Sequence, residues 1–251
     1  MRRFCCMLTT LFLLSFTNTD KKKIRVWLIG DSTMSIKEQK AYPETGWGMP
    51  FVHFFDSTVI IENHAKNGRS TKTFISEKLW ERVINNVREG DYVFIQFGHN
   101  DEAKEKVERY TTPEEYKANL SRFVTETKHK KGNPILLTPV TRRRFDSTGK
   151  IMETHPVYSD AVRALAKELN VPLIDLDKKS QELLQQFGPE TSKLLFLQLQ
   201  PGEHPNYPEG KNDNTHFSEL GARKIAQLVL AEIRALHLEL AQRVVNRSLG
   251  Q

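Results

Sequence analysis

Residues 24–32 read IRVWLIGDS, a run of mostly apolar side chains that ends abruptly in a glycine and two small polar residues. A nearly continuous apolar run of this length is typical of a strand that is covered on both faces of a parallel sheet. Gly30 permits a tight bend where the run ends. The stretch therefore predicts a buried strand with Ser32 in the turn that follows it.

Further short apolar runs alternate with segments of helical pattern. The runs are Val59–Ile61, Tyr92–Phe97, Ile135–Leu137 and Val171–Ile174. The predicted helices begin at Thr112-Pro113, extend over His155–Leu169, and run from Ser218 to about Val245. This alternation predicts a doubly wound α/β fold, in which ligands bind at the carboxyl ends of the strands.

Length and composition are those of a globular chain. It has 251 residues, of which 38% are hydrophobic and 27% charged, so the disordered and fibrous classes are excluded. No repeat or linker interrupts the sequence, and we interpret residues 22–251 as one domain. The net charge of +6 would suit an anionic partner. However, the chain has no aromatic and basic platform for nucleic acid, and no G-x-G-x-x-G follows the first strand to bind a dinucleotide.

The first 19 residues have the pattern of a secretory signal. Two arginines precede a mostly apolar stretch, Phe4 to Phe16, that is too short to span a bilayer as a helix. We therefore expect residues 1–19 to be removed and the protein to be secreted or periplasmic, with no membrane association afterwards. Cys5 and Cys6, the two cysteines of the chain, lie in this segment. The mature protein would then have neither a disulfide nor a thiolate metal ligand.

Four polar tetrapeptides lie where predicted strands end or where the last helix begins. They are Gly30-Asp31-Ser32-Thr33, Asn67-Gly68-Arg69-Ser70, Gly98-His99-Asn100-Asp101 and Asp213-Asn214-Thr215-His216. In an open α/β sheet, the loops at the carboxyl ends of the strands meet at one edge. We therefore expect the four tetrapeptides to form one site.

Ser32, His216 and Asp213 have the chemistry of a nucleophilic catalyst. A serine hydroxyl is inert until a base takes its proton, and the base needs an acceptor that orients it. Asp213 precedes His216 by three residues, so within a turn its carboxylate can contact one ring nitrogen and leave the other for Ser32. Simpler interpretations stay open, with Ser32 as a cap after a strand and His216 as an ordinary residue at a helix start.

Acyl transfer also needs hydrogen-bond donors for the negative oxygen of the tetrahedral intermediate. The backbone N–H groups of Ser32 and Gly68 and the side-chain amide of Asn100 would supply three such donors. The Asn67-Gly68 pair is equally typical of an ordinary turn, so this interpretation depends on the other tetrapeptides.

The four tetrapeptides, taken in this order, resemble those of the SGNH, or GDSL-type, hydrolases. The sequence resembles the rhamnogalacturonan acetylesterase branch more closely, over about residues 24–236. That likeness rests on Gly46-Trp47-Gly48, Asn63-His64-Ala65, Thr138-Pro139-Val140 and the segment from Asp213 to Ser218. The resemblance implies a three-layer, flavodoxin-like α/β/α sandwich with a five-stranded parallel sheet, secretion, no metal or organic cofactor, and removal of O-acetyl groups from pectic polysaccharide.

The same resemblance implies a role for each site residue. Ser32 would be the nucleophile that forms an acetyl-serine intermediate, His216 the base and then the acid, and Asp213 the residue that orients it. Ser32, Gly68 and Asn100 would form the oxyanion hole. The segment from Gln200 to Asn212 departs from the fungal members of the branch, and we expect it to form an extra loop beside the catalytic turn.

Substrate contacts are expected from one aromatic and three basic residues. Trp47, which lies between two glycines, would offer its ring face to a sugar. Arg142, Arg143 and Arg144 follow the fourth predicted strand and would bind the carboxylates of an acidic polysaccharide. A packed aromatic and a solvated basic loop are the alternatives. We expect an acetylated acidic polysaccharide as substrate, no nucleic-acid partner, and a monomer.

Three other functions are compatible with parts of the sequence. The same triad could remove acetyl groups from xylan or another glycan. A metal-dependent hydrolase would hold a divalent cation through the ligand types His99, Asp101, Asp213 and His216. A non-catalytic module for anionic glycans would use Trp47 and the arginines, but it leaves the joint presence of a serine, an aspartate and a histidine unexplained.

Overall fold

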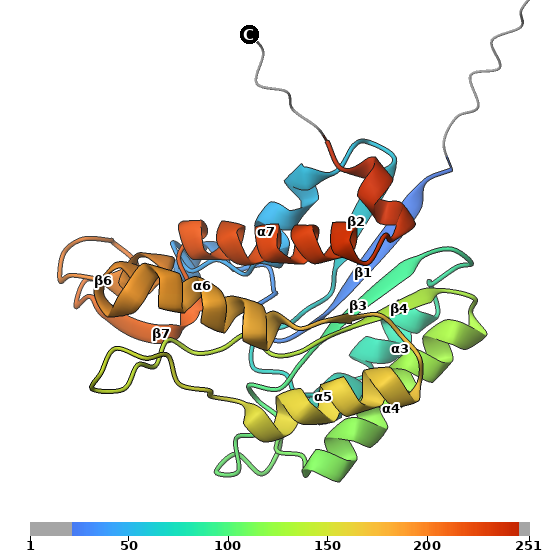
Figure 1. Ribbon diagram of the computed structural model, residues 1–251, viewed down its shortest axis with the longest axis horizontal. Helices are drawn as coiled ribbons and strands as arrows, with labels where there is room; N and C mark the ends of the chain where they lie inside the picture. Colours follow the sequence, from blue (N-terminus) through green and yellow to red (C-terminus); the bar gives the residue numbers. More distant parts are fainter. Residues whose placement is uncertain (1–21, 246–251) are drawn as a thin grey trace, which may run out of the picture.

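The computed structural model describes residues 22–245 and contains the predicted parallel sheet (Figure 1). Its five strands are hydrogen-bonded in the order β2-β1-β3-β4-β5, and every neighbouring pair is parallel. They are β1 (Ile24–Gly30), β2 (Val59–Asn63), β3 (Tyr92–Gln96), β4 (Asn133–Leu137) and β5 (Leu173–Ile174). The order changes direction between β1 and β3, so the loops after these strands flank the switch point where such sheets bind ligands.

Side chains alternate between two cores along β1. Val26 and Leu28 belong to one core and Trp27 and Ile29 to the other, and none of the four is more than 5% exposed. The helices on the first face are α1 (Gly48–Phe51), α6 (Leu176–Thr191) and α7 (Glu219–Ala235). Those on the second are α2 (Thr71–Ser76), α3 (Leu79–Ile84), α4 (Pro113–His129) and α5 (Pro156–Glu168) (Figure 1). The predicted three-layer α/β/α sandwich is therefore confirmed.

Helices α4 and α5 begin where the sequence indicates. Thr112 accepts a hydrogen bond from the Glu115 N–H at 3.2 Å, and the Glu115 carboxylate accepts one from the Thr112 N–H at 2.8 Å. This capping box, with Pro113 in the first turn, stabilises the start of α4. Helix α5 starts directly after His155. Short 3₁₀ segments η1 (Gln39–Ala41), η2 (Val52–Phe54), η3 (Ser192–Leu195) and η4 (Glu239–Arg243) complete the helical elements.

The end predicted for the last helix, near Val245, is wrong. Helix α7 starts after Ser218 as expected but ends at Ala235. His237 adopts a left-handed conformation with φ of 51°, and the N–H of Leu238 donates to the carbonyl of Ile233 at 3.2 Å. This arrangement satisfies the last carbonyls and stops the helix. Because apolar residues continue at similar spacing through η4, the sequence pattern does not show where α7 ends.

A two-stranded antiparallel hairpin, β6 (Phe196–Leu199) and β7 (Lys211–Phe217), lies outside the main sheet (Figure 1). Its connecting turn is most of the segment in which we expected an extra loop, and it packs against η1. The side-chain amide of Asn206 donates to the carbonyls of Gln39 and Tyr42, and the Tyr207 hydroxyl donates to that of Ala41. The hairpin is thereby attached to the segment that follows the Ser32 turn.

The predicted signal, residues 1–19 with Cys5 and Cys6, lies outside the described residues. Within residues 22–245, none of the helices combines the length and the apolar character that crossing a membrane requires.

Candidate active site

Ser32, His216 and Asp213 form a hydrogen-bonded relay at the carboxyl edge of the sheet. The Oγ of Ser32 lies 2.9 Å from Nε2 of His216. The Nδ1 of His216 lies 2.8 Å from Oδ2 of Asp213. Ser32 occupies the turn after β1, as the sequence predicts, and is 9% exposed. At these distances a histidine can take a serine proton while a carboxylate holds its other nitrogen.

Asp213 and His216 lie within β7, whose middle departs from regular pairing. Between the two pairs that frame this segment, β7 carries more residues than β6 does, so the chain forms a local turn inside the strand. The Oδ1 of Asp213 accepts the N–H groups of Thr215 at 2.7 Å and of His216 at 2.9 Å. Burial raises the pKa of Asp213, but the hydrogen bond from the His216 side chain and the charge of that ring outweigh it. The pKa is therefore held well below its ordinary value, and the carboxylate is ionised.

Ser32, Gly68 and Asn100, the three residues expected to supply oxyanion donors, line one cavity. Gly68 has a φ of 75°, a left-handed conformation that glycine adopts without strain. The backbone N–H groups of Ser32 and Gly68 make no hydrogen bond with any part of residues 22–245. Asn100 donates from Nδ2 to the carbonyl of Arg69 at 3.0 Å, which fixes the amide and leaves its second N–H for a ligand.

Lys37 is a buried cation beside Ser32 that the sequence analysis missed. Its side chain is 0% exposed and pairs with Glu44 at 2.7 Å. Its Nζ also donates to the carbonyl of Ser32 and to Oδ1 of Asn67, so it joins two loops that each carry an unpartnered N–H group. Burial lowers the pKa of Lys37, and the attraction of Glu44 opposes this effect. An isolated lysine in a loop is ordinarily exposed, so no local pattern marks this residue.

A second buried network begins at Asp31, the residue before Ser32. The Oδ1 of Asp31 accepts hydrogen bonds from the N–H and the hydroxyl of Thr33, and its Oδ2 lies 3.4 Å from Nδ1 of His99. The rings of His99 and His155 pack with their centroids 4.3 Å apart. Glu102 in turn lies 2.9 Å from Nδ1 of His155. The network therefore connects the Ser32 turn to the loop after β3.

His99 should make the stability of the folded protein depend on pH. Burial, followed by the neighbouring His155, lowers its pKa from 6.5 to about 4, against the opposing attraction of Asp31. In the unfolded chain His99 would bind a proton near pH 6.5, whereas in the folded protein it binds one only near pH 4. Acidification across this window should therefore lower the free energy of unfolding, by on the order of 3 kcal/mol.

Urea unfolding at pH 7 and pH 5 would measure this effect in the wild type and in His99→Gln. The variant lacks the titrating group, so it should lose less stability between the two pH values than the wild type does. Equal losses in both proteins would show that His99 does not cause the dependence.

The relay opens into a cavity of about 490 Å³. Arg142 lines it, but its guanidinium already donates to Thr215 at 2.7 Å and pairs with Glu102 at 3.2 Å. Arg109 lines it as well and donates to the carbonyl of Gly68 at 3.2 Å. It makes no ion pair with any of the described residues 22–245. Arg109 was missed because its charged loop has no distinguishing pattern.

Arg143 and Arg144 are not among the residues that line this cavity. Arg143 donates to Oδ1 of Asn214 at 2.9 Å, to Oγ of Ser192 at 3.0 Å and to the carbonyl of Pro189, so it braces the hairpin. Arg144 is exposed. Of the three arginines expected to bind substrate carboxylates, Arg142 alone therefore lines this cavity.

Trp47 cannot offer a ring face to a sugar, and that expectation is also wrong. The side chain is 0% exposed, packs edge-on against Phe51 and donates from Nε1 to Oε1 of Gln96 at 2.6 Å. The preceding glycine serves backbone packing, since a Cβ at Gly46 would lie 2.0 Å from the carbonyl oxygen of Ser35. The flanking glycines therefore indicate close packing of the chain.

Three of the four side chains considered for a metal, Asp101, Asp213 and His216, are hydrogen-bonded to other groups, and the fourth, His99, packs against the ring of His155. The carboxylate of Asp101 accepts hydrogen bonds from the N–H of Thr71 and the hydroxyl of Thr111, each at 3.0 Å. Asp213 and His216 contact each other. Across residues 22–245, no group of three or more His, Cys, Asp or Glu side chains is arranged to hold a metal ion.

Known proteins share much of this sequence. The GDSL-like Lipase/Acylhydrolase family matches residues 28–224. Rhamnogalacturonan acetylesterase RhgT of Bacillus subtilis (strain 168) is 45% identical over 227 residues, which cover 90% of this chain and 97% of RhgT. The probable rhamnogalacturonan acetylesterase YesY of the same bacterium is 34% identical over 222 residues, 88% of this chain and 97% of YesY.

Solved structures share the fold. YxiM of Bacillus subtilis superimposes with a TM-score of 0.74 at 25% identity, over 87% of this chain and 58% of the YxiM chain. A mutant of Axe2, an acetylxylan esterase from Geobacillus stearothermophilus, gives a TM-score of 0.63 at 21% identity, over 84% of this chain and 94% of Axe2. The family match over most of the chain agrees with the relay at the sheet edge. The chain therefore belongs to the GDSL-like lipase/acylhydrolase family, whose members hydrolyse carboxylic esters.

Proposed function

We propose that this protein removes acetyl groups from rhamnogalacturonan through an acetyl-serine intermediate. The observation that carries the reaction type is the relay of Ser32, His216 and Asp213 beside two unpartnered backbone N–H groups. The names of RhgT and YesY, whose sequences align with about nine-tenths of this chain, support the substrate.

In the first half of the reaction, Oγ of Ser32 attacks the carbonyl carbon of the acetyl ester while Nε2 of His216 takes the hydroxyl proton. The carbonyl oxygen becomes negative and is stabilised by the N–H groups of Ser32 and Gly68 and the amide of Asn100. The bond between the carbonyl carbon and the sugar oxygen then breaks. The sugar oxygen takes the proton from His216 and leaves as a hydroxyl group.

In the second half, a water molecule attacks the carbonyl carbon of acetyl-Ser32 and gives one proton to His216. The ester bond to Ser32 breaks, the Ser32 oxygen takes that proton back, and acetic acid leaves and releases its remaining proton to the solvent as acetate forms. Asp213 stays ionised throughout and keeps Nδ1 of His216 protonated, so that Nε2 is free to accept. The cycle restores every group without a cofactor.

Arg109 is the side chain that we propose for contact with a substrate carboxylate in the catalytic cavity. Its guanidinium lies beside Gly68 and has no carboxylate partner among the described residues. An unpaired guanidinium binds a planar carboxylate through two parallel hydrogen bonds. Arg142, which is already paired with Glu102, would hold the hairpin in place through Thr215.

We also propose that the protein is secreted or periplasmic and acts as a monomer. The support for export is the signal-like composition of residues 1–19. Comparison of the N-terminal residue of the exported protein with that of the cytoplasmic precursor would test it.

Asn100→Ala should lower kcat by about 10²-fold with little change in KM, since an oxyanion donor acts mainly on the transition state. Steady-state kinetics on a small acetyl ester would measure both constants. Asn119→Ala is the control, because Asn119 also donates from Nδ2, to the hydroxyl of Thr71, but does not line the catalytic cavity. An unchanged kcat for Asn100→Ala would remove this residue from the oxyanion hole.

Acetate release from acetylated rhamnogalacturonan and acetylated xylan, measured side by side, would test the substrate. The proposal expects release from the pectic polymer at a kcat/KM well above that for xylan. Preference for xylan would keep the reaction and overturn the substrate. Release from neither polymer, with hydrolysis of a small acetyl ester retained, would leave an esterase for another ester.

A further inference from the structure

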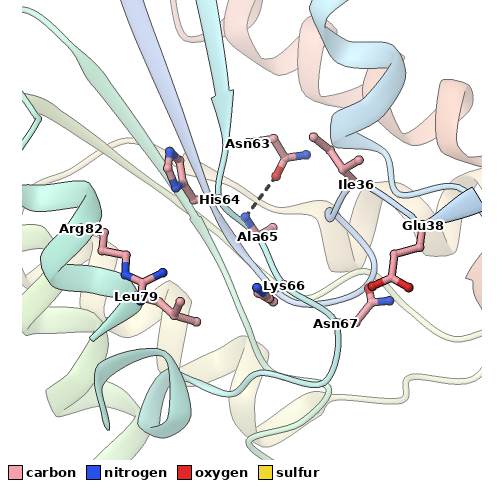
Figure 2. A pocket seen from close by; sticks show the side chains of 9 residues that line it. All are labelled: Ile36, Glu38, Asn63, His64, Ala65, Lys66, Asn67, Leu79 and Arg82. Carbon is pink, nitrogen blue, oxygen red and sulfur yellow. Dashed lines mark hydrogen bonds between the residues drawn. The ribbon is translucent and has the colours of Figure 1, made fainter. Parts of the chain in front are cut away.

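A second cavity, with a volume of about 370 Å³, opens at the same edge of the sheet as the catalytic cavity. Figure 2 shows the side chains that line it. It lies between the loop after β2, the segment after the Ser32 turn, and helix α3. Asn67 lines both cavities. The other residues that line the second cavity are Ile36, Glu38, Asn63, His64, Ala65, Lys66, Leu79 and Arg82.

Two cations of this cavity are without carboxylate partners. Lys66 and Arg82 are exposed, and neither makes an ion pair within residues 22–245. In Figure 2, the side chain of Arg82 extends from α3 in the direction of Lys66. Glu38, the acid of the lining, is paired with Lys40 at 2.8 Å and is influenced more weakly by Lys66. The cavity therefore carries an excess of positive charge.

The remaining lining suits a sugar ring. Ile36 is 61% exposed although it is large and apolar, and Leu79 adds a second apolar surface. The ring of His64 packs against Trp27 with the centroids 5.4 Å apart. Burial lowers the pKa of His64, against the opposing charge of Glu62, so near neutral pH the imidazole is an uncharged hydrogen-bonding group. Apolar patches beside hydrogen-bonding groups match the C–H faces and hydroxyls of a carbohydrate.

Asn67, which lies at the boundary between the two cavities, is held in place by hydrogen bonds. The Oδ1 of Asn67 accepts hydrogen bonds from Oγ of Ser35 at 2.5 Å and from the buried Nζ of Lys37 at 2.9 Å. Since Asn67 lines both cavities, a linear polymer whose ester lies at Ser32 would pass Asn67 on its way into the second cavity.

We propose that the second cavity binds a carboxylate-bearing sugar residue of the same polysaccharide chain whose acetyl ester lies at Ser32, with Arg82 and Lys66 as the carboxylate ligands. The inference rests on the proposed function, because it names how the substrate of that site is recognised. It adds a subsite that is specific for uronate residues and separate from the reacting groups.

The test uses the double variant K66Q/R82Q and a control of equal charge change, R88Q/K167Q. Arg88 and Lys167 are also exposed and free of ion pairs within the described residues. They precede β3 and β5, so they lie at the opposite edge of the sheet. Calorimetry would measure the binding of unacetylated oligogalacturonate to the wild type and both variants. Kinetics would follow acetate release from rhamnogalacturonan and hydrolysis of a neutral small ester.

We expect K66Q/R82Q to weaken oligogalacturonate binding about tenfold at low salt, since two charge-assisted contacts are lost. KM for the acidic polymer should rise to a similar extent, while kcat on the neutral ester stays unchanged. The control should retain wild-type values. Unchanged binding in K66Q/R82Q, or an equal loss in the control, would overturn the subsite. If binding depends on Lys66 and Arg82 but the wild type releases no acetate from rhamnogalacturonan, the proposed function fails and the subsite stands.

Discussion

Ser32→Ala should lower kcat for acetate release by about 10⁴-fold or more, because no other hydroxyl within residues 22–245 is hydrogen-bonded to His216 to form the proposed acyl intermediate. The Oγ of Ser32 makes its hydrogen bond to His216, so its loss leaves the packing of β1 and its turn untouched. Initial rates on a small acetyl ester, with the variant at high concentration, would measure the remaining activity. KM should change far less than kcat, since the cavity keeps its shape.

Three observations separate this expectation from a merely structural role for Ser32. The thermal unfolding midpoint of Ser32→Ala should match that of the wild type. Acid quenching of the wild type during turnover should trap an acetyl group on the peptide that contains Ser32. Ser76→Ala is the control and should leave kcat unchanged, since the Ser76 hydroxyl donates to the carbonyl of Thr73 at 3.4 Å and the residue lines neither cavity. Activity that survives in Ser32→Ala would contradict the role of Ser32 as nucleophile and would favour metal-assisted hydrolysis.

Asp213→Asn should lower kcat by about 10³- to 10⁴-fold, an effect that works through the histidine. An amide nitrogen in the place of Oδ2 would donate to Nδ1 of His216, which forces the ring proton onto Nε2 and prevents it from accepting the Ser32 proton. If the amide turns the other way, its NH₂ group faces the backbone N–H groups of Thr215 and His216 that now donate to Oδ1. This contact between donors disfavours the second orientation, so the first one, which removes the base, should predominate.

Asp146→Asn is the control for this change. The Oδ1 of Asp146 also accepts two backbone N–H groups, from Thr148 at 2.8 Å and from Lys150 at 3.0 Å, but Asp146 does not line the catalytic cavity. It should leave kcat unchanged. A kcat for Asp213→Asn within a few-fold of the wild type would show that His216 is oriented by its backbone and needs no carboxylate.

The sheet and the relay can be predicted from the sequence because each leaves a pattern within a few consecutive residues. A strand covered on both faces must be apolar at successive positions, which is why residues 24–29 and 92–97 stand out. The spacing of Asp213 and His216 is likewise short enough to be seen in one turn. The site then follows from topology, since the loops after β1 and β3 must meet at the switch point.

Other features depend on contacts between distant segments and leave no local pattern. Trp47 is buried because its Nε1 finds Gln96 and its ring finds Phe51. The position of Arg109 is set by the carbonyl of Gly68, 41 residues away. Lys37 is buried because three oxygen acceptors converge on its ammonium group. In each case the partner is distant in the sequence, so the contact cannot be predicted without the three-dimensional arrangement of the loops.

The hairpin that carries Asp213 and His216 lies outside the main sheet and close to the carboxyl end of the chain. A ribosome that has delivered the chain as far as Ile174 has supplied all five strands of that sheet together with Ser32. It has not yet made the two residues that would activate the serine. On the proposed mechanism, a product truncated before β7 would therefore contain Ser32 without the histidine and the carboxylate that activate it.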